Sequence, residues 1–439
     1  MTPIPFSEPP WLCGLPSPIY TPSHIAFQQK ARAFIDKHLN TFALEYERQI
    51  HVPPEVFTTF ANANMLIPNL PSPLPVQWLQ RLGIRDVLGT PVEEFDYIHN
   101  LIYCDEMSRS GLVGPGASLT AGFAFGIPPL LRFGSSSLQE KFLPNLLTGK
   151  KRACIAITEP GAGSDVANIE TVAEKTADGT AYIVNGTKKW ITNGLWADYA
   201  TMAVRTGPSD SGAKGLSLLV VPLINHPGVS VRKIEVSGSK SSGTAYIDLS
   251  DVRIPVSNLI GTEGAGMKYI MQNFNHERLT IAIGVTRQAR VALSEAFAYC
   301  MRREAFGAPL IDMGVVRHRL AKAGALLESQ WAWVENFVYQ MTRLGKEEAD
   351  RELGGLTALC KAQAGIVLDE CARVGVLLLG GNGFTEGGVG EVVQRIYRDV
   401  PGARVPGGSE DVMMDLAVRQ LVRNFREREK GMRKGGVKL

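Results

Sequence analysis

The periodicity of the apolar residues changes twice along this 439-residue chain, and that change limits its possible folds more than any other feature. Apolar residues recur at helical spacing from about Ser23 to Gly149, as in HIAFQQKARAFIDKHL. Short alternating runs such as AYIVNG and LSLLVVPL, separated by turn residues, follow from about Ile155 to Ile260. Helical spacing returns after Gly266. The order helix, sheet, helix excludes a doubly wound parallel sheet, and so a standard nucleotide-binding fold.

We therefore predict an α+β fold of three domains. A helical N-terminal domain covers residues 1–152, an antiparallel β-sandwich or barrel covers 153–262, and a C-terminal four-helix bundle covers 263–439. The links between the middle strands are too short for crossover helices, which favours antiparallel pairing. The stretch after Gly266 predicts one helix of more than thirty residues, a length typical of bundles.

Composition excludes several classes of function. The 46 basic and 43 acidic residues leave a net charge of only +3, which gives no field that would attract nucleic acid. The six cysteines are scattered without zinc-ligand spacing, so we predict reduced thiols and no metal site. Residues 111–131 carry no charge but contain five glycines and three prolines, which favours a buried, kinked core segment over a membrane span.

The termini carry few localisation signals. No lysine or arginine precedes Lys30, so neither a secretory signal nor a mitochondrial presequence is evident. The last three residues are similar to a peroxisomal S-K-L signal with valine in the serine position; they are Val437, Lys438 and Leu439. We expect an intracellular protein, cytoplasmic or peroxisomal.

One glycine-rich turn has the composition of an anion or cofactor site. In CIAITEPGAGSDVA a strand-like run leads into Gly161 and Gly163, whose backbone N–H groups could hold the polar edge of a cofactor. ITEPGAGSD resembles the signature of the acyl-CoA dehydrogenase family. Four further motifs follow in the order that this family has: KKWITNG, RREAFG, LLGGNGF, and YRD followed by PGGSEDVM. The resemblance covers roughly residues 23–425.

This resemblance implies FAD as cofactor and an acyl-CoA thioester as substrate. The expected reaction removes an α-proton and a β-hydride to give trans-2-enoyl-CoA, and family members are tetramers that complete each flavin site with a neighbour's residues. The cofactor-binding residues implied are Ile155, Ile157, Thr158, Gly163, Ser164, Trp190, Ile191, Thr192, Ser409 and Asp411, with Arg303, Phe306, Gly380 and Gly381 reaching a neighbour's FAD. The substrate-binding residues implied are Ser164, Asn275 and Arg278.

The catalytic base is the point at which this sequence departs from most of the family. Most members of the family carry a catalytic glutamate at the position of Gly407. A minority, including the isovaleryl-CoA and long-chain enzymes, carry it on the long helix of the C-terminal domain. At that position this chain has Glu277. We expect Glu277 to be the base and the N–H of Gly407 to donate to the thioester oxygen. Glu410 and Asp411 are the rival carboxylates.

The partner, the substrate range and some contacts are less constrained. A helix-borne base favours a medium-length, long or branched acyl chain, and the electron acceptor is an electron-transferring flavoprotein or oxygen. We expect a homotetramer or homodimer with neither nucleic acid nor a membrane span. Two positions usually glutamine in the family are Gly314 and Leu377, which puts some FAD contacts in doubt. The alternatives are an acyl-CoA oxidase, a biosynthetic desaturase, or a non-catalytic flavin-binding homologue.

Overall fold

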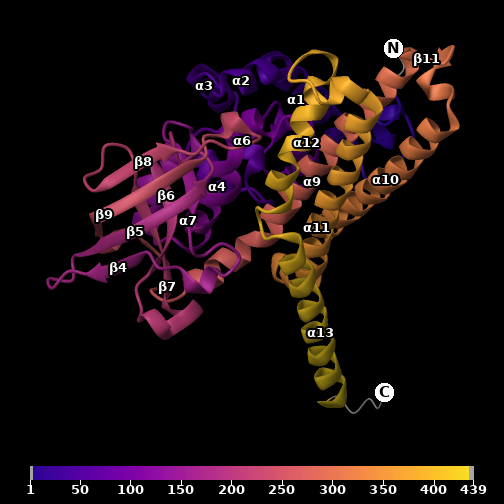
Figure 1. Ribbon diagram of the computed structural model, residues 1–439. Coiled ribbons are helices and arrows are strands. Elements are labelled where there is room, and N and C mark those ends of the chain that lie inside the picture. Colours follow the sequence, from indigo (N-terminus) through magenta and orange to yellow (C-terminus); the bar gives the residue numbers. More distant parts are fainter. Residues whose placement is uncertain (1–2, 435–439) are drawn as a thin grey trace. The chain divides into compact units, whose positions relative to one another are not determined.

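The computed structural model describes residues 3–434, with the side chains of 431–434 left out; the predicted signal at Val437–Leu439 lies outside them. Contacts divide the chain into two compact units. The first contains Pro22–Met107 and Leu112–Phe274, and the second contains the segment up to Thr21, the short Ser108–Gly111 and all residues from Asn275 onward. Helices, strands and helices follow one another along the chain as predicted (Figure 1).

The first unit begins with short helices and a β-hairpin. These are α1 Pro22–His38, α2 Ala43–Gln49, α3 Pro54–Asn62, α4 Val76–Arg81, β1 Asp86–Val87, β2 Thr90–Pro91, α5 Tyr97–Met107, α6 Val113–Ala121, α7 Ile127–Phe133 and α8 Ser136–Leu147. The uncharged stretch is largely buried, as predicted, and a five-residue π-helix, Gly122–Gly126, joins α6 to α7. A Cβ on Gly122 would lie 2.3 Å from the carbonyl oxygen of Ala153, so glycine lets this turn approach the first strand of the sheet.

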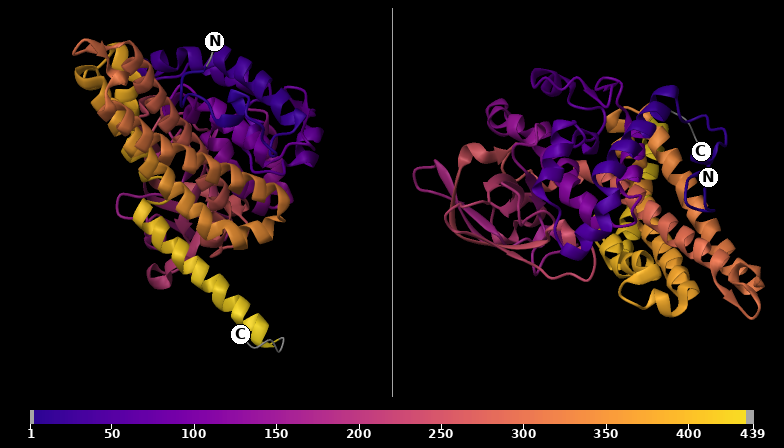
Figure 2. Two further views of the ribbon diagram at one scale, coloured as in Figure 1. Left: turned by 90° about the vertical axis from the view of Figure 1, so that its right-hand side faces the viewer. Right: turned by 90° about the horizontal axis from the view of Figure 1, so that it is seen from above.

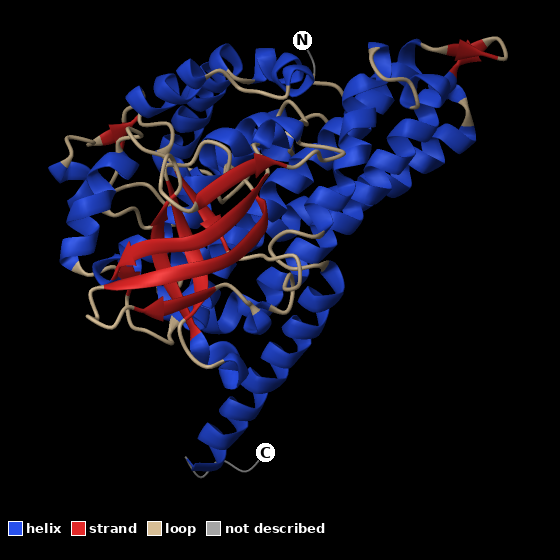
Figure 3. Ribbon diagram, turned by 60° about the vertical axis from the view of Figure 1, so that its left-hand side comes forward, coloured by secondary structure: helices blue, strands red, loops and turns tan. Residues whose placement is uncertain are grey.

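The middle of the chain forms one eight-stranded sheet (Figure 3). Its strands are β3 Ala153–Ala156, β4 Val172–Lys175, β5 Ala181–Ile191, β6 Tyr199–Arg205, β7 Leu216–Pro222, β8 Val229–Lys233, β9 Ala245–Pro255 and β10 Leu259–Ile260. Pairing is antiparallel as predicted, except that β6 runs parallel to β3 and, at one residue pair, to β4. The reason is that β3 and β6 are joined through the glycine-rich segment and the β4–β5 hairpin, a connection long enough to return the chain in the same direction.

The second unit consists mainly of long helices (Figure 2). After Gly266 the chain forms α9 Gly266–Arg302, β11 Glu304–Ala305, β12 Ala308–Pro309, α10 Gly314–Arg343, α11 Lys346–Leu379, α12 Glu391–Arg404 and α13 Glu410–Lys434. The predicted long helix is therefore 37 residues long. Helix α11 packs against α10, α12 and α13, while the C-terminal half of α13 extends past these helices (Figure 1).

Candidate functional site

The end of β3 and the end of β5 bring several predicted flavin-binding residues together. The N–H of Lys189 donates to the carbonyl oxygen of Thr158 at 2.9 Å, so the TEPGAGSD segment starts beside KKWITNG. Trp190, next to the last residue of β5, has a positive φ of 59° and is 49% exposed. Ile191 is buried, and Ile155, Ile157, Thr158 and Thr192 are half-buried. An exposed indole face next to hydroxyl groups suits a flat, polar-edged ring.

A buried ion pair that sequence reasoning missed holds this arrangement. The Nζ of Lys188, which is fully buried, lies 2.7 Å from Oε1 of Glu159 and donates to the carbonyl oxygen of Ile157 at 3.1 Å. Burial lowers the pKa of Lys188 to about 8, although Glu159 opposes this. Burial acts to raise the pKa of Glu159, but Lys188 brings it below the usual value. Strand alternation could have revealed the pair, because Lys188 shares the inward face of Tyr182 and Val184.

The glycine-rich segment itself is open. The N–H of Glu159 donates to the carbonyl oxygen of Ala162 at 3.0 Å, which closes a tight turn, and the next two residues, Gly163 and Ser164, are exposed. A Cβ on Gly161 or Gly163 would meet no atom within 4 Å. These residues therefore fit the polar part of a cofactor such as FAD, since both the turn backbone and a hydroxyl group are accessible.

The residues expected to reach a neighbour's FAD lie on the exposed surface of the second unit. Phe306, in the β11–β12 hairpin, is 97% exposed with φ 54°, and Arg303 beside it is also exposed. Gly380 and Gly381 follow α11 in open space. Leu377, at a position usually glutamine in the family, is exposed as well.

The predicted base and the glycine turn come together in the second unit. The Nε of Arg278 on α9 donates to the carbonyl oxygen of Gly407 at 3.3 Å. Gly407 has φ 71°, and a Cβ there would lie 2.8 Å from Cδ1 of Ile281. Glu277, which is 7% exposed, lies one helical turn before Ile281 on the same face of α9. The turn at Gly407 thus lies against the stretch of α9 that bears Glu277, although Arg278 and Gly407 are 129 positions apart in sequence.

Charges around this turn separate the rival carboxylates. Glu410 accepts from Nε of Arg404 at 2.8 Å, and this hydrogen bond lowers the pKa of the Glu410 carboxyl. A carboxylate paired with arginine is a weak base, so Glu410 suits proton abstraction poorly. Asp411 is exposed, and Ser409 accepts from the N–H of Met413 at the start of α13.

Three polar side chains, two of them on α9 and one on α11, lie near the predicted base and the turn. The Nδ2 of Asn275 donates to Oδ1 of Asp350 on α11 at 3.2 Å. Arg278 is 3% exposed, and burial lowers its pKa to about 10. Lys361 on α11, which sequence reasoning also missed, donates to the turn at Arg404 and Gly408.

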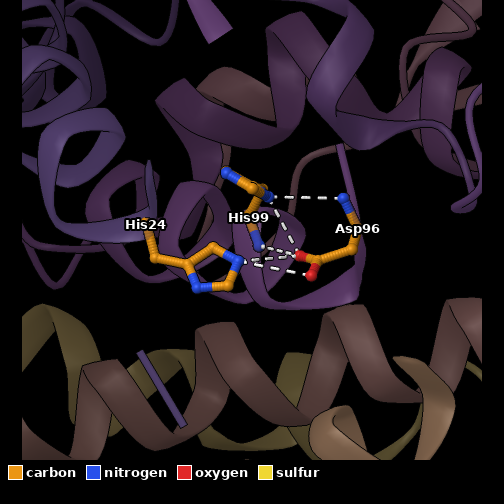
Figure 4. A group of neighbouring side chains, drawn as sticks. All are labelled: His24, Asp96 and His99. Carbon is orange, nitrogen blue, oxygen red and sulfur yellow. Dashed lines mark hydrogen bonds and ion pairs between the residues drawn. The ribbon is translucent and has the colours of Figure 1, made fainter. Parts of the chain in front are cut away.

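His24, Asp96 and His99 form a separate cluster in the first unit (Figure 4). Oδ1 of Asp96 accepts from the N–H groups of Ile98 and His99 at 2.9 and 3.1 Å, so Asp96 caps the start of α5. Burial acts to raise the pKa of Asp96, but hydrogen bonds from both histidines hold it well below its usual value. Asp96 thus caps α5, and its contact with His24 links the start of α5 to α1.

Three family models match the chain in sequence order. They are described as the N-terminal domain (residues 21–150), the middle domain (154–252) and the C-terminal domain (264–422) of acyl-CoA dehydrogenase. Fold and matches together place the chain among the FAD-dependent oxidoreductases that act on acyl-CoA thioesters. The chain belongs to the acyl-CoA dehydrogenase family.

Individual relatives agree over nearly the full length. Acyl-CoA dehydrogenase apdG of Emericella nidulans is 64% identical, covering 99% of this chain and 99% of its own. Acyl-CoA dehydrogenase AFT10-1 of Alternaria alternata is 36% identical over 95% of each. The crystal structure of a putative acyl-CoA dehydrogenase from Mycobacterium smegmatis aligns with a TM-score of 0.80 at 30% identity, over 92% of this chain and 99% of its own. In the described part of this chain, no helix has the length and hydrophobicity to cross a membrane.

Proposed function

We propose that this enzyme converts an acyl-CoA to trans-2-enoyl-CoA with Glu277 as the base, in the manner of the subgroup with a helix-borne glutamate. The observation that carries the proposal is the contact of the Gly407 turn with Arg278 and Ile281 on the helix that bears Glu277. In the described chain the N–H groups of Gly407 and Gly408 donate to no protein acceptor, so they are available to a ligand oxygen.

The chain's own groups share the work on the α-carbon. The carboxylate of Glu277 takes the α-proton, and its burial keeps competing water away. The N–H of Gly407 stabilises the negative charge that develops on the thioester oxygen, a contribution typically of about 3 to 4 kcal/mol. FAD, when bound, accepts the hydride that leaves the β-carbon.

We assign the cofactor and substrate contacts by the same reasoning. Trp190 and the hydroxyl groups of Thr158 and Thr192 hold the flavin ring, and the open turn at Ser164 holds its pyrophosphate. Arg278 and Asn275 bind the CoA arm.

The acyl chain is of medium or greater length or branched, and the acceptor is an electron-transferring flavoprotein or oxygen. The division into domains at 152/153 and 262/263 stays a prediction.

The test mixes the purified yellow protein anaerobically with acyl-CoAs of graded length and branching, and follows flavin absorbance. Bleaching by some thioester is expected, and Glu277→Gln should slow it by about 10²- to 10⁴-fold because the base is lost. Glu295→Gln makes the same change at an exposed position of α9 and should bleach normally. Glu410→Gln tests the rival carboxylate.

Two results would refute the proposal. One is a flavin that no thioester bleaches, and the other is Glu277→Gln bleaching at the wild-type rate. Loss of bleaching in Glu410→Gln but not in Glu277→Gln would move the base to the turn. Repeating the reaction in air shows whether oxygen competes as acceptor.

A further inference from the structure

Lys361 is a buried lysine on α11 whose ammonium binds backbone rather than a carboxylate. It is 1% exposed, and its Nζ donates to the carbonyl oxygens of Arg404 and Gly408, each at 2.8 Å. No carboxylate in the described chain comes within ion-pair distance of it. Burying an ammonium group costs desolvation free energy unless its N–H groups are hydrogen-bonded. These two hydrogen bonds are the main compensation for that cost.

The two carbonyl groups bracket the turn that contains Gly407. Arg404 is the last residue of α12, and Gly408 lies just before α13 begins at Glu410. Arg278 donates to the carbonyl oxygen between them, that of Gly407. Cations from two different helices therefore bind three carbonyl groups within five consecutive residues.

These bonds restrict the peptide planes of the turn. In a trans peptide the carbonyl and the following N–H point in opposite directions, so fixing one fixes the other. The peptide that carries the N–H of Gly407 lies between the planes fixed at Arg404 and at Gly407. Gly407 and Gly408, at φ 71° and 102°, also have no Cβ to restrict their backbone, so contacts have to hold this stretch in one conformation.

The positive charge is also close to the turn. The Cε of Lys361 lies 3.9 Å from where a Cβ on Gly407 would be. A cation in a water-poor site stabilises a nearby oxyanion more strongly than one in water. Burial, followed by the charge of Arg278, lowers the pKa of Lys361 to about 8, against the effect of Glu410.

We propose that Lys361 is a positioning residue for the dehydrogenation: it holds the Arg404–Gly408 turn so that the N–H of Gly407 keeps one orientation toward the thioester oxygen. This inference rests on the proposed function. The inference goes beyond the proposed function because it assigns the orientation of the oxyanion donor to Lys361, a side chain that does not itself touch the substrate.

The test compares Lys361→Met with Lys30→Met. Methionine is unbranched and only one atom shorter than lysine, but it has neither the donor nor the charge. Lys30 is the matched control because its Nζ also donates to a backbone carbonyl, that of Leu88 at 2.9 Å, far from the turn in sequence. In anaerobic half-reactions, Lys361→Met should lower the rate constant of flavin reduction about 10- to 100-fold. The dissociation constant of the acyl-CoA and the flavin content should change by less than about threefold, since a positioning role acts on the transition state. Lys361→Arg should recover part of the rate.

Amide hydrogen exchange reports on the turn separately from turnover. A peptide spanning residues 403–409 should exchange faster in Lys361→Met and unchanged in Lys30→Met. Should Lys361→Met fail to fold, Lys361→Gln replaces it, because its neutral side chain is one atom shorter than that of lysine and cannot make both hydrogen bonds to Arg404 and Gly408.

The outcomes separate this inference from the proposed function. A folded Lys361 variant that reduces flavin at the wild-type rate overturns the inference while the function stands. An equal loss of rate and of acyl-CoA binding also overturns it, because that pattern indicates general damage. If no thioester reduces the wild-type flavin, the proposed function and this inference fall together.

Discussion

At the scale of single residues, the conformation of Gly407 matters as much as its missing side chain. Its φ of 71° lies in the left-handed region, and Cδ1 of Ile281 occupies the space next to it. A glutamate at this position, as most of the family has, would require the Ile281 side chain to move. This geometry supports the proposal that the catalytic carboxylate of this chain is Glu277 on α9.

Gly407→Ala should therefore reduce both stability and rate. The left-handed conformation alone costs an L-residue about 1 to 2 kcal/mol, and the contact with Ile281 adds to it. Urea denaturation measures the first effect and flavin reduction the second. Gly402→Ala is the control, because that glycine lies within α12 in open space and alanine favours helix by about 1 kcal/mol. Wild-type stability in Gly407→Ala would contradict the strained geometry.

At the scale of elements, the N-terminal segment from Pro3 to Thr21 packs against α9 and α10 in the second unit. Arg287 of α9 donates to the carbonyl oxygen of Ser7 at 2.8 Å, and Arg290 donates to those of Phe6 and Glu8. Both arginines are buried. All but the last residue of the segment lies before the first family-model match, which begins at residue 21.

The ring of Phe6 fits against Gly324 of α10, where a Cβ would lie 2.4 Å from Cε1 of Phe6. Gly324→Ala should destabilise the wild type by about 1 to 3 kcal/mol through overpacking. In a Phe6→Ala background the same change should stabilise by up to about 1 kcal/mol, because alanine is the better helix former. Thermal denaturation of the four proteins measures this reversal. If the effects of Phe6→Ala and Gly324→Ala on stability are additive, the Phe6 ring does not pack against Gly324 in solution.

At the scale of the whole molecule, α13 presents an apolar stripe at helical spacing. Val418, Leu421, Val422 and Phe425 are exposed, with Phe425 at 62%. Four apolar side chains are therefore exposed along one face of this helix. An exposed apolar stripe on a helix is typical of a surface that another chain covers.

We therefore expect a homotetramer or homodimer in which this stripe is covered. Phe425→Glu should shift the molecular mass toward a smaller species, because a charge would be buried in the contact. Size-exclusion chromatography with light scattering at several protein concentrations measures it. Arg423→Glu changes the charge on another face of α13 and should leave the mass unchanged. An unaltered mass for Phe425→Glu would exclude the stripe as the contact.

The sequence by itself determined the order of the elements, the long α9 and the motifs that indicate the family, because hydrophobic periodicity and turn residues act locally. It missed the parallel pairing of β3 with β6, which depends on a long return of the chain. It also missed two buried lysines. Strand alternation places Lys188 on the inward face of β5, whereas a single lysine on a helix, such as Lys361, carries no sign of burial in a linear pattern. Tertiary structure alone decided that the turn at Gly407 lies against the helix that bears Glu277. The contact of Arg278 with Gly407 joins residues 129 positions apart and depends on how α9, α11 and the turn before α13 pack.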